Sequence, residues 1–111
     1  MKLLTKAILT AFAKQGSTAD KSAKDIKIIC KLFGGAACTW WLYEQDKEDP
    51  DLFMCFATLG DPSCAECGTV SLKELQSIRF PPLGLVVERN LYYEIGEQTL
   101  QDVIDANNKL K

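Results

Sequence analysis

Near the start of the chain, apolar residues recur with the period of an α-helix. The stripe that they form consists of Leu4, Ile8 and Phe12. Thr5 is suited to cap the first turn, because its hydroxyl can accept a backbone N–H, and Gly16 is suited to end the helix in a left-handed conformation. The pattern therefore predicts a helix over residues 5–15.

The apolar pattern then changes to the alternation that is typical of β-strands. Residues 16–25 are small and polar, and we expect them to form a flexible connection. Residues 26–33 place apolar side chains on one face and lysines on the other, and residues 39–45 are rich in β-branched and aromatic side chains. Both segments are predicted to be strands, joined by a turn at 34–37.

A second turn and a third strand follow. Residues 46–51 are polar and acidic, and Pro50 prevents a strand from continuing through them. Residues 52–59 are almost all apolar, which predicts a central strand that is covered on both faces. A loop over 60–67 then leads to a short strand at 68–72.

Capping patterns predict two more helices. Ser71 and Glu74 form a capping-box pattern at the start of a short helix, which the prolines at 81–82 must end. Residues 85–95 are predicted to form one bent strand or two short ones. A second capping pattern opens a terminal helix over 99–111.

The predicted order is a helix, three successive strands, a short strand, a short helix, a further strand segment and a helix. Short connections between consecutive strands favour antiparallel pairing. The length of 111 residues suits one domain. We therefore predict an α+β fold, a single domain over 1–111 with an antiparallel sheet of four to five short strands.

The compartment is expected to be the cytoplasm. No apolar run is long enough to span a bilayer. The opening segment does not fit a secretory signal, because Lys6 interrupts its apolar stretch and Lys14 occupies the place of a small-residue cleavage site. Five cysteines, an odd number, favour a reducing environment.

The formal net charge of −2 conceals an asymmetry along the chain. Residues 1–33 have a balance of +5, whereas residues 34–111 have a balance of −7. A solvated helix face and loop explain the lysines most simply, and a nucleic-acid-binding module is the alternative. The side chains of that alternative surface are Lys14, Lys21, Lys24, Lys27, Lys31 and Trp40.

Cys64 and Cys67 form the one familiar chemical motif, a C-x-x-C pair. Structural zinc needs four ligands, but the chain has no histidine and no second cysteine pair. A reactive thiolate is disfavoured by the neighbouring acids Asp61 and Glu66. We therefore expect no resident metal or cofactor, and a loop with two ordinary thiols.

Carboxylates offer the remaining route to catalysis. Glu44 lies on a predicted strand and Asp46 follows it two positions later on the same face, so the two carboxylates could bind a hard cation. Exposed acidic patches are far more often solvated surface. The usual nucleophilic triads are excluded, because no histidine is available as the base. A metal-dependent enzyme on clustered carboxylates stays an alternative, and no enzymatic activity is expected.

Several segments dispersed between Met1 and Glu94 resemble the shared motifs of one protein family. These segments are "MKLLTK", "TWWLYEQDKEDPD", "GTVSLKEL" and "PLGLVVERNLYYE". Together they resemble a small uncharacterised bacterial family, a domain of unknown function carried on plasmids, integrative elements and phages. The matching positions are Trp40, Glu44, Asp46, Glu66, Gly68, Ser71, Leu72, Leu75, Gly84, Glu88 and Arg89.

Two departures from the family pattern bear on chemistry. Asn90 stands where an aspartate is usual, which weakens any proposal of a carboxylate cluster. Cys64 and Cys67 lie where the family has no cysteine motif, which argues further against zinc.

The resemblance implies a biological context. Small acidic proteins of mobile elements often act as accessory or anti-defence factors that bind and block a host nuclease or restriction machine. We expect a non-enzymatic protein that binds a host or element-encoded protein complex, makes no membrane contact, and uses an acidic face that mimics or masks a nucleic-acid-binding surface. The expected binding residues are Glu44, Asp46, Glu48, Asp49, Asp51, Glu66, Glu88 and Arg89.

Overall fold

Within residues 2–35 and 37–111, which the computed structural model describes, three α-helices and five strands follow one another in the predicted order. Ala36, in the turn predicted at 34–37, lies outside the described residues. The helices are α1 (Lys6–Gln15), α2 (Leu72–Ser77) and α3 (Leu100–Asn108). The strands are β1 (Cys30–Gly34), β2 (Cys38–Gln45), β3 (Leu52–Leu59), β4 (Glu66–Ser71) and β5 (Glu88–Arg89). Two single turns of 3-10 helix, η1 (Ala23–Asp25) and η2 (Pro62–Cys64), lie in the loops.

The helix boundaries follow the predicted caps. The Thr5 hydroxyl accepts a hydrogen bond from the Ile8 backbone N–H, and Gly16 ends α1 with a φ of 61°. Thr99 and Asp102 form a reciprocal capping box at the start of α3. Each cap supplies partners for backbone N–H groups that have none inside the helix, which is why these boundaries can be predicted from local sequence.

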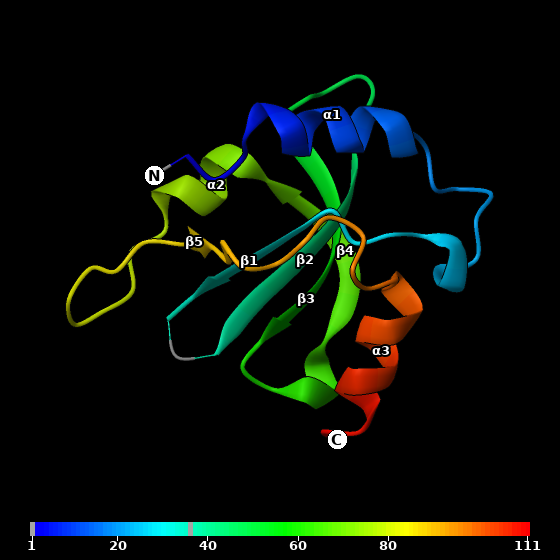
Figure 1. The fold of residues 1–111 in the computed structure, drawn as a ribbon. Helices are drawn as coiled ribbons and strands as arrows, with labels where there is room; N and C mark the ends of the chain where they lie inside the picture. The colour runs from blue at the N-terminus through cyan, green and yellow to red at the C-terminus, as the bar shows by residue number, and fades with distance from the viewer. Residues whose placement is uncertain (1, 36) are drawn as a thin grey trace.

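The strands form one antiparallel sheet in the order β4-β3-β2-β1-β5, as Figure 1 shows. The predicted α+β fold with an antiparallel sheet is therefore confirmed. Between β2 and β3 the register shifts by one residue at Tyr43, between the pairs Leu42↔Cys55 and Glu44↔Met54. Leu42 and Tyr43 are both buried although they are adjacent in the strand, because they face the two cores on opposite sides of the sheet.

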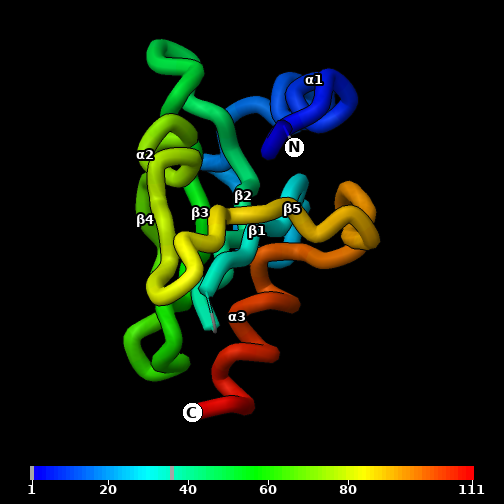
Figure 2. The backbone as a smooth tube through the Cα atoms, turned by 90° about the vertical axis from the view of Figure 1, so that its left-hand side faces the viewer, coloured from blue at the N-terminus to red at the C-terminus, as the bar shows by residue number. Residues whose placement is uncertain are grey.

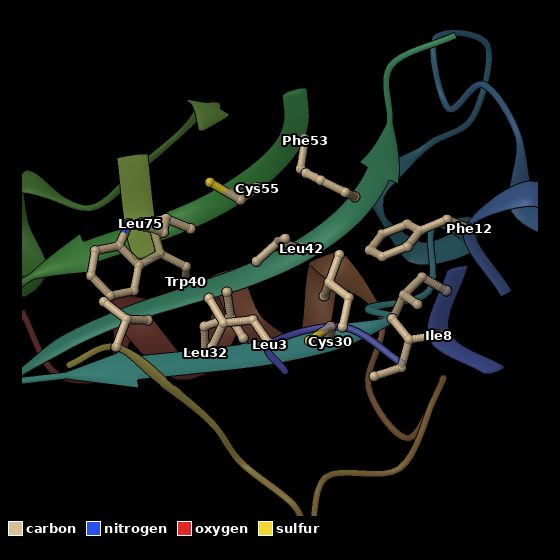
Figure 3. Packing of buried hydrophobic residues seen from close by; sticks show 13 residues of the cluster. Leu3, Ile8, Phe12, Cys30, Leu32, Trp40, Leu42, Phe53, Cys55 and Leu75 are labelled. Atoms are coloured by element: carbon tan, nitrogen blue, oxygen red, sulfur yellow. The ribbon is translucent and has the colours of Figure 1, made fainter. Parts of the chain in front are cut away.

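The main core lies between one face of the sheet and helices α1 and α2. Ile8 and Phe12 of α1 and Leu75 of α2 pack there against buried side chains of β1, β2 and β3, which Figure 3 shows. The Phe12 and Phe53 rings lie 5.1 Å apart, centroid to centroid, in a tilted arrangement. Burial of this apolar surface holds the N-terminal helix on the sheet.

The opposite face of the sheet carries a smaller core beneath α3. Its buried residues are Ile26, Ile28, Tyr43, Phe56, Leu100 and Val103. In both Figure 1 and Figure 2, α3 runs away from α1, so that the N- and C-termini lie at opposite ends of the molecule. No helix within the described residues is long and apolar enough to cross a membrane.

The first strand differs from its prediction. The prediction extended it over 26–33 with strict alternation, but β1 begins only at Cys30, and Ile28 and Ile29 are both buried. The reason is that the Ile28 N–H pairs with the Gln98 carbonyl while the Ile29 N–H pairs with the Leu42 carbonyl. The single apolar face predicted for this segment is therefore divided: Ile26 and Ile28 belong to the smaller core, whereas Cys30 and Leu32 belong to the main core on the opposite face of the sheet.

Two other segments also depart from prediction. Strand β4 begins at Glu66 rather than in the predicted range 68–72, because Glu66 and Cys67 pair with Ala57 and Phe56 of β3. The predicted strand or strands at 85–95 reduce to the two residues of β5. The chain leaves the ladder just beyond β5, where the Asn90 side chain accepts the Tyr92 N–H and forms a turn.

Candidate functional site

The predicted acidic face corresponds to the turn between β2 and β3 and its flanks, residues 44–51, called the acidic turn below. Asp46 Oδ2 accepts the backbone N–H groups of Glu48 and Asp49, and Asp49 Oδ1 accepts that of Asp51. These side chains therefore hold the turn as well as carrying its charge. Asp46, Glu48 and Asp49 are exposed, so the turn presents carboxylates to solvent at fixed positions.

Asp51 joins the acidic turn to α2. Its Oδ2 accepts the Ser71 hydroxyl at 2.5 Å, and its Oδ1 accepts the Lys73 backbone N–H at 3.0 Å. The hydrogen bond from Ser71 is the main cause that lowers the pKa of the Asp51 carboxyl. Asp51 therefore stabilises the first turn of a short helix in addition to its contribution to surface charge.

Glu44 has a structural partner as well. Its Oε1 accepts the backbone N–H of Thr18 at 2.7 Å and the hydroxyl of Thr18 at 2.5 Å. Thr18 is 5% exposed, so the segment predicted at 16–25 as a flexible connection is anchored on the sheet at this point. Glu44 is therefore half-buried, and Thr18 of the preceding loop holds its carboxylate.

The remaining predicted binding residues are not brought together with the acidic turn. Glu66 begins β4 and Glu88 begins β5, and these strands are the two opposite edges of the sheet. Arg89 Nη1 donates to the carbonyl oxygens of Lys2 and Leu3, each at 2.8 Å. Arg89 therefore fixes the N-terminal segment, and no single polar patch unites these residues with the turn.

Three of the predicted lysines do converge. Lys14, Lys21 and Lys27 line one groove of about 310 Å³ between the end of α1 and the segment before β1. Gln15 also lines the groove, and its amide nitrogen donates to the carbonyls of Lys27 and Tyr43. Asp25 also lines this groove and reduces its positive charge. Lys24 and Lys31 do not line it.

Trp40, which was assigned to the alternative nucleic-acid-binding surface, is not available on a surface. It is 5% exposed and lies in the main core, where Figure 3 shows it among apolar side chains. Its neighbour Trp41 points to the opposite face, because adjacent residues of a strand alternate. Trp41 is only half-buried there and packs against Phe56, with ring centroids 5.9 Å apart.

Sequence reasoning missed a groove on this second face. It has a volume of about 440 Å³ and lies between the strands β1 to β3 and helix α3. Its floor includes Lys31, Thr39, Trp41 and Thr58, and Val103 is part of its α3 wall. The signal in the sequence was the spacing of Thr39 and Trp41, which are two positions apart in a predicted strand and therefore share a face, but the covering helix could not be placed from sequence. This hollow is called the α3 groove below.

An exposed apolar segment was also missed. Residues 83–95 contain six of the large apolar side chains that are exposed in the described part of the chain, and Tyr92 is 95% exposed. The six are Leu83, Leu85, Val86, Leu91, Tyr92 and Ile95. Figure 1 shows the loop after α2, which carries Leu83, projecting beyond the β5 edge of the sheet.

Three backbone hydrogen bonds close this loop. The Phe80 carbonyl accepts the N–H groups of Gly84 and Leu85, and the Phe80 N–H donates to the Leu85 carbonyl. The Phe80 ring packs on the backbone of Gly34 and Gly35, where a side chain would overlap it. Leu83 and Leu85 are therefore displayed on a hydrogen-bonded turn.

Neither of the two exposed thiols lines the α3 groove or the groove formed by the three lysines. Cys64 lies in η2, and its thiol donates to the Asp61 carboxylate at 3.8 Å, whereas Cys67 lies in β4. In the part of the chain that the structure describes, no three His, Cys, Asp or Glu side chains gather in a metal-binding arrangement. Cys30 and Cys55 are buried in the main core.

Comparisons with known proteins agree with the resemblance noted in the sequence. Neither the curated proteins nor the solved structures contain a match to this chain. A family profile does match, and it spans residues 3–110, which include the acidic turn, the α3 groove and the exposed apolar segment. The chain belongs to the family described as "Protein of unknown function (DUF2958)".

Proposed function

We propose that this chain acts by protein binding, as a non-enzymatic accessory factor of a mobile element or phage, on a host or element-encoded protein complex. The observation that carries the proposal is the exposure of six large apolar side chains within residues 83–95, of which Leu83 and Leu85 lie on a hydrogen-bonded turn. Exposed apolar side chains that gather in one segment of a soluble domain typically mark a protein interaction surface. Burial against a partner would recover the free energy that their exposure to water costs.

The acidic turn supplies selectivity in this proposal. Its carboxylates are held by hydrogen bonds within the turn, so they keep their spacing before a partner binds. A fixed acidic surface attracts basic surfaces and repels acidic ones, and it accelerates encounter more than it strengthens the final complex. The partner would therefore present a basic surface, such as one that handles nucleic acid, and the complex would inhibit that role.

The test is affinity capture from a bacterial host lysate with matched surface variants. Leu83→Ser and Tyr92→Ser remove exposed apolar side chains, and Leu59→Ser, which is 68% exposed on β3, is the control. We expect at least one protein to be recovered about tenfold less by the first two variants than by the control. Equal recovery of every protein by all variants would contradict the proposal.

The acidic turn is tested separately with isosteric amides. Asp46→Asn, Glu48→Gln and Asp49→Asn together remove three charges and preserve side-chain acceptors for the backbone of the turn. The control removes three exposed carboxylates elsewhere: Asp20→Asn, Glu97→Gln and Asp105→Asn. We expect the turn variant alone to slow association with the captured partner at low salt, as measured by surface plasmon resonance. Equal association rates would remove the turn from the interface.

Nucleic-acid binding is the second candidate, supported by the convergence of Lys14, Lys21 and Lys27 on one groove. Phosphate contacts by lysines release counterions, so the affinity would fall steeply with salt. A gel shift with duplex DNA and single-stranded RNA at low ionic strength tests this role. The triple variant Lys14→Gln/Lys21→Gln/Lys27→Gln should lose binding, and Lys47→Gln/Lys73→Gln/Lys109→Gln should retain it. No shift with the unchanged chain would exclude this candidate.

A further inference from the structure

The α3 groove combines an aromatic floor with a cation. In the sheet register, Lys31 lies opposite Trp41 and Thr39 opposite Thr58. Residues that are opposite in antiparallel strands, or two apart in one strand, point to the same face. All four side chains therefore face α3, which explains why residues distant in sequence meet in one groove.

The charge in this groove belongs to Lys31. Its ammonium lies 5.6 Å from the centroid of the Trp41 ring and 5.9 Å from that of Tyr93. A cation–π contact attracts the ammonium to the rings and leaves its positive charge intact. The cation is therefore held at one position beside an indole ring, where it can pair with an anion.

The remaining walls fix the shape of the site. Thr39 and Thr58 place two hydroxyl groups on the floor, and Asn107 is 6% exposed in the opposite wall. The Asn107 amide nitrogen donates to the Pro62 carbonyl at 3.0 Å, which joins α3 to η2 at the margin of the groove. A volume of about 440 Å³ lies within the range of small-molecule sites in proteins.

We propose that the α3 groove is a binding site for a small aromatic anion, whose ring lies on Trp41 and whose acidic group pairs with Lys31. The indole surface and the apolar α3 wall favour a planar ring over a flexible chain. The single cation in the lining selects an anion over a neutral ring. The site is on the face of the sheet opposite α1 and α2, and it does not depend on the proposed protein-binding surfaces.

The experiment compares two probes of the same ring system on the full chain. Anilinonaphthalene sulfonate carries an acidic group, and phenylnaphthylamine is its neutral counterpart. Titration followed by probe fluorescence should give one saturable site with about tenfold higher affinity for the sulfonate, the size expected of a charge-assisted contact. Equal affinity for the two probes, or no saturable binding of the sulfonate, would overturn the proposal.

Single substitutions test whether the probe binds in the α3 groove. Lys31→Met should lower sulfonate affinity about tenfold, leave the neutral probe within about twofold, and be rescued by Lys31→Arg. Ala106→Leu, on the α3 wall, should weaken both probes because it fills the groove, whereas Ala13→Leu on α1 should weaken neither. Leucine is a good helix former, so both alanine variants are expected to fold. Full sulfonate affinity in Ala106→Leu would place the probe elsewhere and refute the site.

Discussion

The Ser71 hydroxyl donates a hydrogen bond of 2.5 Å to the Asp51 carboxylate and also accepts the Glu74 backbone N–H at 3.3 Å. One side chain thus caps α2 and ties it to the acidic turn. The capping-box pattern predicted Ser71 as the cap, and the structure adds Asp51, twenty residues earlier, as its partner. Surface charge and helix stability are therefore coupled at this point.

The coupling predicts a dependence of stability on pH. The hydrogen bond from Ser71 lowers the pKa of Asp51 in the folded state, so the ionised form is favoured by folding. This contribution is present above the unfolded pKa of about 3.9 and is lost as the pH falls through the lower folded pKa. Urea unfolding between about pH 5 and about pH 2 should show a shallower loss of stability in Asp51→Asn than in the unchanged chain.

The control for this prediction is Glu48→Gln, an exposed carboxylate of the same turn. It should retain the slope of the unchanged chain. An equal slope in Asp51→Asn and the unchanged chain would show that Asp51 does not couple folding to protons.

A close contact makes Gly34 intolerant of a side chain. A Cβ on Gly34 would overlap the Phe80 ring, with the ring Cζ at 2.9 Å. Gly34→Ala should therefore lower the free energy of unfolding by about 1–3 kcal/mol through overpacking, measured by urea denaturation. Gly68→Ala is the matched control, because a Cβ there meets nothing within 4 Å. A loss of stability in Gly68→Ala as large as in Gly34→Ala would contradict this explanation.

The N-terminal segment depends on Arg89. Its guanidinium donates to the carbonyl oxygens of Lys2 and Leu3, and Leu3 is buried in the main core. Arg89→Gln should cost about 1–2 kcal/mol, because a charged donor to two carbonyls is lost at a partly exposed site. Hydrogen exchange should accelerate in the first residues before the rest of the sheet. Arg79→Gln, whose side chain bonds only to neighbouring carbonyls of its own segment, should leave that exchange unchanged.

Four of the five cysteines fall into two groups that should differ sharply in reactivity. Burial raises the pKa of the Cys30 and Cys55 thiols to about 12, whereas Cys64 and Cys67 are exposed. Because the thiolate is the reactive form, iodoacetamide should modify Cys64 and Cys67 first in the native protein. Peptide mass spectrometry should find Cys30 and Cys55 modified only after urea is added. Fast native labelling of either buried thiol would contradict the packing of the main core.

The family motifs are explained in part by structure. Ser71 and Leu75 serve the cap and the core contact of α2, and Arg89 holds the N-terminus. Glu66 and Glu88 lie exposed on opposite edges of the sheet, and no contact within the described residues accounts for them. These two carboxylates are the family positions at which a binding role is best tested next.

The sequence by itself determined the local elements of this protein. The caps at Thr5, Ser71 and Thr99 act within three residues of themselves, and the alternation of apolar positions marks strands through the backbone geometry of each segment. These interactions need no knowledge of distant residues. The α+β class and the antiparallel pairing of consecutive strands could likewise be predicted, because the connections between these strands are short.

Only the tertiary structure decided which face of each strand is buried and which strands form the edges of the sheet. Trp40 and Trp41 must point to opposite sides, but the position of α1 and α2 determined that Trp40 is the buried one. The order of the strands places Glu66 and Glu88 at opposite edges of the sheet. Helix α3 forms one wall of the α3 groove. The physical reason is that burial and proximity follow from long-range pairing, which alternation within a single strand does not specify.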